Sequence, residues 1–186
     1  MELKKIDKVQ EGKFLVRYDL TYEGKDNLSK KYEIVSRNKD LKTIEDLRGD
    51  NYTDAVVMIL HDEGREKILL CKEYRMAIGK RIFGFPSGLV EEGEGIIDAC
   101  ARELKEETGL ELVSVEKIFK GSYSAIGVCN EKSVCIIGTA KGEITGSNDV
   151  MEDIITEWYT KDEVREILEN EDLATRVQTY CYMWTK

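Results

Sequence analysis

Stretches of alternating and continuous hydrophobic residues dominate the first half of the chain. Residues 13–22 and 31–37 alternate in part and are rich in Val, Leu and Tyr, which predicts the two strands of a hairpin around a turn at residues 24–27. Residues 55–60 form a continuous apolar run, which is typical of a strand buried on both faces. Residues 67–74 are expected to pair with this buried strand.

The hydrophobic period changes after residues 82–90, a Gly-rich stretch that we interpret as irregular. Apolar residues then recur at i, i+3, i+4 and i+7, the spacing of one helical face. Gly109 is placed to end this predicted helix in a left-handed conformation. The residues of the predicted apolar stripe are Ile97, Cys100, Ala101 and Leu104.

The last third of the chain predicts more strands and two more helices. Strands are expected near residues 111–123, 132–140 and 154–159. The capping-box pattern at residues 160–163 predicts a helix that begins at Lys161, and a last helix is predicted over residues 173–184. Strands mixed with a few helices, without strict alternation, indicate an α/β or α+β fold.

Composition and charge exclude several classes of partner. The 186 residues carry 37 acidic and 28 basic side chains, a net charge of −9, which argues against a nucleic-acid polymer as partner. No apolar run approaches the roughly 18 residues of a membrane span, and the N-terminus does not resemble a signal peptide. Five cysteines without a C-x-x-C pair indicate reduced thiols and a cytoplasmic location.

Three glutamates share one face of the first predicted helix: Glu103, Glu106 and Glu107. Like charges at this spacing repel each other and destabilise a helix, so something must offset them. One interpretation is a solvated acidic face helped by Arg102 and Lys105. The other is a site for a divalent cation, and the charge cluster alone does not decide between them.

The surrounding residues form a longer motif. Residues 88–110 read GLVEEGEGIIDACARELKEETGL and meet every fixed position of the Nudix box, G-x5-E-x7-R-E-U-x-E-E-x-G-U with U aliphatic. The chain therefore resembles the Nudix hydrolases. The resemblance implies an α/β/α sandwich with a mixed sheet, and magnesium-dependent hydrolysis of a diphosphate linkage in a nucleotide derivative.

The resemblance also implies a set of metal ligands. Glu103 and Glu107 would be the main ligands of Mg²⁺, with Glu106 in support. The Gly-rich loop at Ser87 and Gly88 would let a backbone carbonyl approach the ion. Oxygen ligands suit hard cations that keep several waters, so Mn²⁺ could replace Mg²⁺.

Other positions of the box have supporting roles by the same resemblance. Arg102 and Glu94 would orient the helix and the preceding loop, and Gly109 would end the helix. The only histidine, His61, follows a predicted strand and has no nucleophile motif near it, so we interpret it as structural. A general base, if the reaction uses one, is then expected to be a carboxylate.

The flanking sequence is similar to the ADP-ribose and ADP-sugar pyrophosphatases within this superfamily. Residues 32–37 (YEIVSR) resemble an aromatic-Glu-x-Val-x-Arg strand of that group, and residues 73–75 and 85–88 resemble its Q-Y-R and L-P-A-G segments. An N-terminal antiparallel β-hairpin extension before the core is also typical of it. The resemblance implies that residues 1–50 form this extension, which takes part in a homodimer and in the nucleotide pocket, and that residues 51–186 form the Nudix hydrolase domain.

This second resemblance assigns substrate-binding residues. Tyr32 would stack on a base, and Glu33 would accept hydrogen bonds from an exocyclic amine. Arg37 and Arg75 would hold phosphates. Glu131, in the segment that resembles a glutamate-bearing loop of these enzymes, would bind metal or act as the base.

Two departures widen the substrate class. Residues 123–127 lack the proline that is usual in the ADP-ribose group, and Tyr32 stands where that group has a tryptophan. The expected reaction is hydrolysis of ADP-ribose or a related nucleoside diphosphate sugar to a nucleoside monophosphate and a sugar phosphate. Two alternatives stay open: a pyrophosphohydrolase that removes damaged nucleoside triphosphates, and a non-catalytic Nudix domain that senses a nucleotide metabolite.

Overall fold

The structure is a computed structural model that describes residues 1–50, 52–147 and 153–186. The chain divides into two compact units. The first consists of Met1–Asp54 and Gly121–Ser133, and the second of Ala55–Lys120 and Val134–Lys186. The chain therefore leaves the first unit after Asp54 and returns to it for one short segment.

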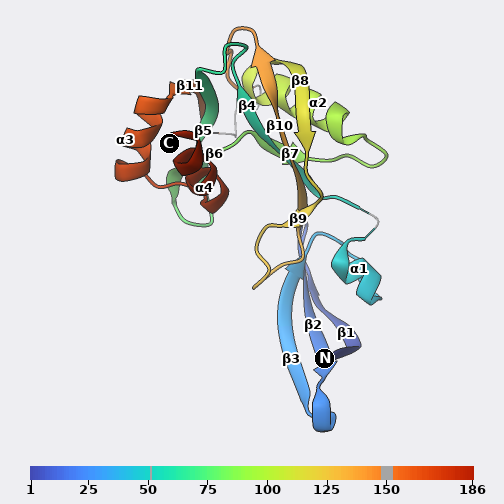
Figure 1. Ribbon diagram of the computed structural model, residues 1–186. Coiled ribbons are helices and arrows are strands. Elements are labelled where there is room, and N and C mark those ends of the chain that lie inside the picture. The colour runs from blue at the N-terminus through green and yellow to red at the C-terminus, as the bar shows by residue number, and fades with distance from the viewer. Residues whose placement is uncertain (51, 148–152) are drawn as a thin grey trace. The chain divides into compact units, whose positions relative to one another are not determined.

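The first unit contains a three-stranded antiparallel sheet in the order β1-β2-β3 (Figure 1). The predicted hairpin is confirmed as β2 (Val16–Glu23) and β3 (Ser29–Ser36), joined through the short 3-10 helix η1 (Lys25–Asn27). An additional strand, β1 (Glu2–Glu11), precedes them. Its sequence, ELKKIDKVQE, is mostly charged and polar, so its hydrophobic pattern gave no signal for a strand.

One face of this sheet is covered by the segment that follows β3. This segment contains the short helix α1 (Ile44–Arg48). Thr43 and Asp46 form a capping box at its start, and Gly49 ends it with φ +61°. The buried core of the unit consists of Val16, Tyr18, Leu20, Ile34 and Leu41, and Leu47 of α1 packs against it.

The second unit is built on a sheet with the strand order β11-β5-β4-β10-β8. β6 pairs with β5, and β7 pairs with β4. The short strand β9 (Ser122–Tyr123), which belongs to the first unit, pairs with the first two residues of β10. The strands of the sheet are β4 (Ala55–His61), β5 (Lys67–Arg75), β6 (Lys80–Gly84), β7 (Ser87–Leu89), β8 (Glu111–Ile118), β10 (Lys132–Lys141) and β11 (Ile154–Thr160).

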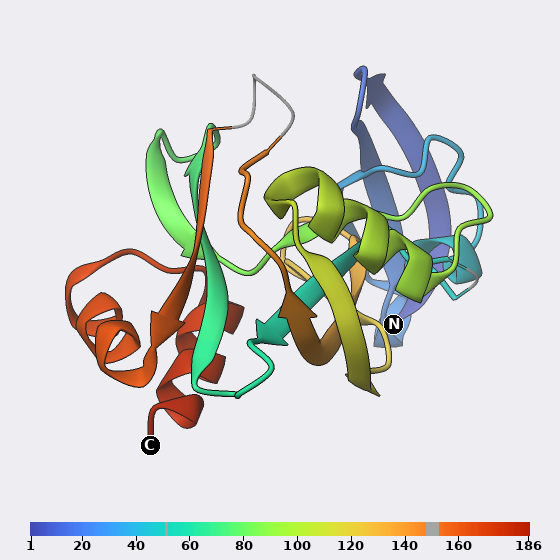
Figure 2. The ribbon, with the colours of Figure 1, turned by 90° about the horizontal axis from the view of Figure 1, so that it is seen from above.

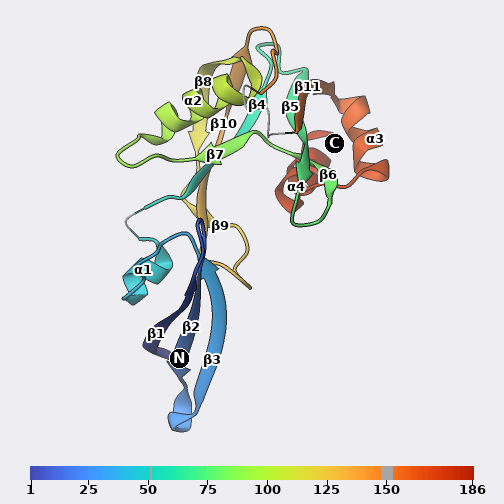
Figure 3. The ribbon, with the colours of Figure 1, turned by 180° about the vertical axis from the view of Figure 1, so that it is seen from behind.

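Helices cover both faces of this sheet (Figures 2 and 3). Alternate residues of a strand point to opposite faces, and Leu69 of β5 packs in one core cluster while Ile68 and Leu70 pack in the other. The helix α2 (Ile96–Thr108) contributes to the first cluster, and α3 (Lys161–Asn170) and α4 (Thr175–Trp184) contribute to the second. The predicted α/β/α sandwich is therefore confirmed.

The apolar stripe predicted for α2 is wrong at two of its four positions. Cys100 and Leu104 are buried, but Ile97 is 49% exposed and Ala101 is also exposed. The buried face is rotated toward Thr108, whose hydroxyl donates to the carbonyl of Leu104 at 2.6 Å and is thereby satisfied inside the core. An apolar pattern cannot register such a polar residue. The buried residues of α2 are Ala99, Cys100, Leu104, Glu107 and Thr108.

Other predictions are confirmed or corrected in detail. The capping box at Thr160 is present and α3 begins at Lys161, as predicted. Gly109 ends α2 with φ +79°, also as predicted. Residues 82–90, expected to be irregular, contain most of β6 and all of β7. Within the described ranges, no helix is both long enough and apolar enough to cross a membrane.

His61 lies at the end of β4 and is only 3% exposed. Its Nδ1 lies 3.2 Å from the carbonyl oxygen of Lys67, and its Nε2 lies 3.0 Å from the hydroxyl of Tyr180. Because a carbonyl only accepts, Nδ1 carries the ring proton and Nε2 accepts from Tyr180. This neutral ring agrees with the structural role expected for His61, and its burial lowers its pKa below the usual value.

We predict that a proton NMR titration of the histidine ring gives a pKa below 6.5 in the folded protein and about 6.5 in urea. The unfolded chain then takes up a proton that the folded chain resists, so the free energy of unfolding falls as the pH drops below about 6.5. The spectrum is simple to assign because the chain has one histidine. A folded-state pKa at or above 6.5 would contradict this account of His61.

Candidate active site

Arg102 is the centre of an ion-pair network on α2. Its Nε and Nη2 donate to the two carboxylate oxygens of Glu94, both at 2.8 Å, and Nη2 also donates to the carbonyl of Leu89 at 2.9 Å. Such a two-point pair fixes the relative orientation of both groups. The hydrogen bonds from Arg102 lower the pKa of Glu94 to about 2, so this carboxylate stays charged. The loop between β7 and α2 is thereby tied to the helix.

The same guanidinium also contacts two of the three clustered glutamates. Nη1 of Arg102 donates to Glu103 at 2.9 Å and to Glu106 at 3.2 Å. Lys105, the other cation considered for this role, instead donates to the carbonyl of Gly109 and lies 3.8 Å from Glu111. One guanidinium therefore faces three carboxylates, and negative charge remains in excess. We call this group, Arg102 with Glu94, Glu103 and Glu106, the Arg102 network.

The space for the Glu103 carboxylate depends on Gly88. Gly88 lies on β7 opposite Val56, and a Cβ atom at position 88 would lie 1.9 Å from the carboxyl carbon of Glu103. Only glycine leaves room for this carboxylate. The third glutamate, Glu107, is buried, with 9% of its surface exposed.

The predicted metal ligands fit a hard cation by their chemistry, although their side chains do not converge. Across residues 1–50, 52–147 and 153–186, no group of three or more His, Cys, Asp or Glu side chains is arranged to hold a metal ion. Glu103 and Glu106 turn toward Arg102 instead. Ser87 is half-buried on β7, where it precedes the glycine that makes room for Glu103. Carboxylate oxygens and a cradle lined by glycine are suited to Mg²⁺.

Two other predicted site residues of the second unit have clear local roles. The left-handed Gly109 could not carry a side chain, because a Cβ there would lie 2.2 Å from the hydroxyl oxygen of Thr145. Arg75, at the end of β5, pairs with Glu73 at 2.9 Å. Its guanidinium is therefore engaged on its own strand.

Tyr32 and Glu33 lie on opposite faces of the sheet in the first unit. They are consecutive residues of β3, and consecutive side chains of a strand point to opposite sides. The hydroxyl of Tyr32 donates to the carbonyl of Gly127 at 2.7 Å. Glu33, whose side chain is 71% exposed, lies 3.4 Å from Arg17 instead. One chain therefore does not present both side chains to one pocket.

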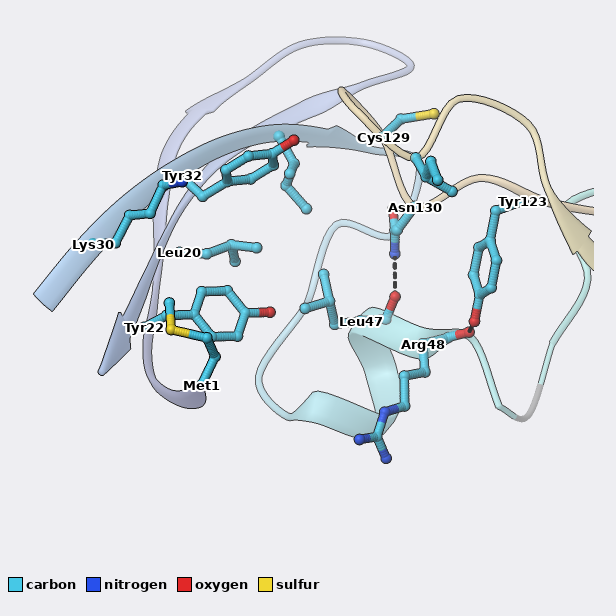
Figure 4. Close-up of a pocket in the computed structure, with 12 residues that line it drawn as sticks. Met1, Leu20, Tyr22, Lys30, Tyr32, Leu47, Arg48, Tyr123, Cys129 and Asn130 are labelled. Carbon is cyan, nitrogen blue, oxygen red and sulfur yellow. Dashed lines mark hydrogen bonds between the residues drawn. The ribbon is translucent and has the colours of Figure 1, made fainter. Parts of the chain in front are cut away.

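Tyr32 lines a pocket of about 450 Å³ within the first unit (Figure 4). The sheet, α1 and the segment around Gly127 supply its walls. Asn130 donates to the carbonyl of Leu47 at 3.2 Å and so holds α1 to this segment. The pocket is mainly apolar, and its wall residues include Leu20, Tyr22, Tyr32, Ile34, Leu47 and Tyr123.

Arg37 and Glu131, to which the sequence analysis gave separate roles, form an ion pair. Nε of Arg37 donates to Glu131 at 3.0 Å, and both side chains are about one-third exposed. Asp54 lies beside them and was missed by the sequence analysis, because an isolated acid before a strand has no distinctive pattern. Burial raises the pKa of the Asp54 carboxyl; the N–H of Lys132 opposes this rise, and the charge of Glu131 adds to it.

Comparisons with known proteins agree with this architecture. The NUDIX domain matches residues 51–180. The chain is 40% identical over 55 residues to putative nudix hydrolase 2 of Caenorhabditis elegans, and 35% identical over 75 residues to ADP-ribose pyrophosphatase of Bacillus subtilis strain 168. These matches cover 30% and 40% of this chain. A crystal structure of an ADP compounds hydrolase has the same fold, with a TM-score of 0.75 and 16% identity over 99% of this chain and 92% of that one.

The domain match covers more than half of the chain, so the chain belongs to the NUDIX domain family. The likeness to individual curated proteins is shorter. The chain spans 25% of the length of the C. elegans protein and 39% of the length of the B. subtilis protein.

We predict that Gly88→Ala weakens the binding of a divalent cation at least roughly tenfold and changes the free energy of unfolding by less than about 1 kcal/mol. The new methyl group displaces the flexible end of Glu103 rather than backbone, so the cost falls on the position of the carboxylate. Mn²⁺ titration followed by electron paramagnetic resonance measures the affinity, and urea unfolding measures the stability.

Gly84→Ala is the matched control. Gly84 lies on β6, the strand before β7 in the sequence, and a Cβ there would meet its nearest atom at an ordinary 3.9 Å. The account of Gly88 is contradicted if both alanine variants bind Mn²⁺ as the wild type does.

Proposed function

We propose that the protein hydrolyses the diphosphate linkage of ADP-ribose or a related nucleoside diphosphate sugar, giving a nucleoside monophosphate and a sugar phosphate. The observation that carries this proposal is the Arg102 network beside the Gly88 cradle. It holds carboxylates in a fixed, charged arrangement with more negative than positive charge. The name of the B. subtilis relative, ADP-ribose pyrophosphatase, supports the substrate class.

We assign Glu103 and Glu107 as the main ligands of Mg²⁺ or Mn²⁺, with Glu106 and the backbone at Ser87 in support. The fit rests on hard oxygen donors and on the room that Gly88 leaves for Glu103. The chemistry that such an ion supplies when bound is a lowered pKa for a ligated water and a reduced charge on the diphosphate.

The chain's own residues prepare this site. Arg102 holds Glu94 with two bonds, so the loop before α2 and the helix keep one relative position. Arg102 also lies within hydrogen-bond distance of Glu103 and Glu106, which keeps these acids together before any cation binds. Such positioning by surrounding residues sustains both affinity and rate at metal sites. Glu131 is our candidate for the further catalytic glutamate.

The first unit supplies the features expected of a nucleoside-binding site. Its apolar pocket and the partly exposed ring of Tyr32 suit a flat base, and the bond to Gly127 fixes the ring. Within the described part of the chain, the guanidinium of Arg37 makes one hydrogen bond, from Nε to Glu131, so its Nη atoms suit a phosphate. Glu33 and Arg75 stay proposals for the amine and phosphate contacts, and both have ion-pair partners.

The homodimer and the cytoplasmic location are proposals too. All five cysteines are free thiols, which supports a reducing compartment. The dimer rests on the resemblance to the ADP-sugar group alone, and light scattering after size-exclusion chromatography would measure it. Hydrolysis of damaged nucleoside triphosphates and metabolite sensing are the competing functions, and the complete Nudix box favours an enzyme.

We predict Mg²⁺-dependent release of a nucleoside monophosphate from ADP-ribose or another nucleoside diphosphate sugar. Glu107→Gln should lower kcat by roughly 100-fold or more, because it removes a charged ligand at constant size. Glu111→Gln, on an exposed residue of β8, is the control and should leave kcat unchanged. Turnover of triphosphates alone would replace the proposed substrate class, and no turnover of any nucleotide would favour the sensor.

We further predict that Tyr32→Ala raises KM for the nucleotide substrate roughly tenfold and leaves kcat within about twofold. Stacking on an aromatic ring contributes about 1–3 kcal/mol per base. Tyr32→Phe keeps the ring and loses only the bond to Gly127, so its KM should stay near that of the wild type. Equal KM values for the alanine variant and the wild type would remove Tyr32 from the substrate site.

A further inference from the structure

Glu131 is held through its backbone as well as through its side chain. The peptide group between Glu131 and Lys132 is bonded at both ends. Its carbonyl oxygen accepts the N–H of Ser124 at 3.0 Å, and its N–H donates to the carboxylate of Asp54 at 2.8 Å. This peptide is therefore fixed in orientation, and with it the position from which the Glu131 side chain projects.

Asp54 forms a second hydrogen bond to Lys132. Its own N–H donates to the carbonyl of Lys132 at 2.8 Å, so Asp54 and Lys132 exchange two hydrogen bonds. Asp54 is half-buried, and a half-buried carboxylate that accepts a backbone N–H forms a stronger bond than a neutral acceptor would. Arg37 meanwhile holds the carboxylate of Glu131 at 3.0 Å.

We infer that Asp54 is a positioning residue for Glu131: its carboxylate fixes the Glu131–Lys132 peptide and so aims the Glu131 side chain. This inference rests on the proposed function, in which Glu131 is a catalytic glutamate. Asp54 does not touch the substrate in this account. Its effect is therefore on kcat rather than on substrate affinity, since a small misplacement of a catalytic group lowers the rate of the chemical step.

The test compares Asp54→Ala with Asp54→Asn in the full chain, using Mg²⁺ and the nucleoside diphosphate sugar that the wild type hydrolyses. Alanine removes the acceptor, and we expect kcat to fall roughly tenfold with KM unchanged. Asparagine keeps an oxygen that can accept the N–H of Lys132, so it should restore most of kcat. In the Glu131→Gln background, Asp54→Ala should cause no further loss.

Asp62 offers a matched control for the loss of a carboxylate-to-backbone bond. It exchanges the same two hydrogen bonds with Lys67, at 2.8 and 3.2 Å, in the turn between β4 and β5. Asp62→Ala should leave kcat unchanged. If Asp54→Ala does not fold, Asp54→Leu removes the acceptor at similar size. Amide hydrogen exchange at Lys132 then reports directly whether the hydrogen bond from its N–H is lost.

The outcomes separate the two proposals. A wild type without any nucleotide turnover would overturn the proposed function, and the positioning role of Asp54 would fall with it. An active wild type whose Asp54→Ala variant keeps kcat would overturn only the positioning role. The positioning role would also be overturned if Asp54→Ala lowered kcat equally in the Glu131→Gln background. It would be overturned as well if Asp54→Asn did not restore kcat.

Discussion

The contact between Arg102 and the carboxylates of Glu94, Glu103 and Glu106 is the interaction on which the site depends. Three acids on adjacent turns and a nearby loop would repel one another, and a helix carrying them would be weakened. A planar guanidinium with several donors in a fixed fork can contact all of them, which a lysine ammonium could not do with the same geometry. The guanidinium consequently keeps the acids close together, and the remaining negative charge favours a divalent cation.

The sandwich places this network on a rigid base. α2 packs through Cys100 and Leu104 into a core cluster formed with β4 and β10, which fixes the helix that carries the acids. β7 pairs with β4 and presents Gly88 to the helix, where the absence of a side chain leaves room for the Glu103 carboxylate. The packed core therefore determines where the carboxylates lie. The site depends on the absence of a side chain at Gly88 as well as on the acids themselves.

The residues that the sequence predicted best are those whose role depends on local pattern. The end of α2 at Gly109 follows from the spacing of the hydrophobic stripe before it, and the start of α3 at Lys161 follows from its capping box. The prediction failed where tertiary contacts decide. The five-residue helix α1 is too short to show a period, β1 has a polar sequence, and Thr108 is buried because its hydroxyl finds a backbone partner.

The first unit shows a second reason why some site residues cannot be predicted from the sequence. The motif at residues 32–37 places an aromatic ring and an acid side by side in the sequence, yet strand geometry sends Tyr32 and Glu33 to opposite faces. Asp54 is invisible in the sequence because its importance arises from one backbone N–H far along the chain, at Lys132. Contacts of this kind can be recognised only in the folded structure, whereas the acid cluster on α2 can be recognised from the helical spacing of its residues in the sequence.

The most direct measurement is the anomalous scattering of Mn²⁺ in crystals of the protein soaked at millimolar concentration. We expect an ion bound to carboxylate oxygens of Glu103 and Glu107, with Arg102 still paired to Glu94. Crystals without an ion at these glutamates, in which Glu103 and Glu106 contact only Arg102, would contradict it.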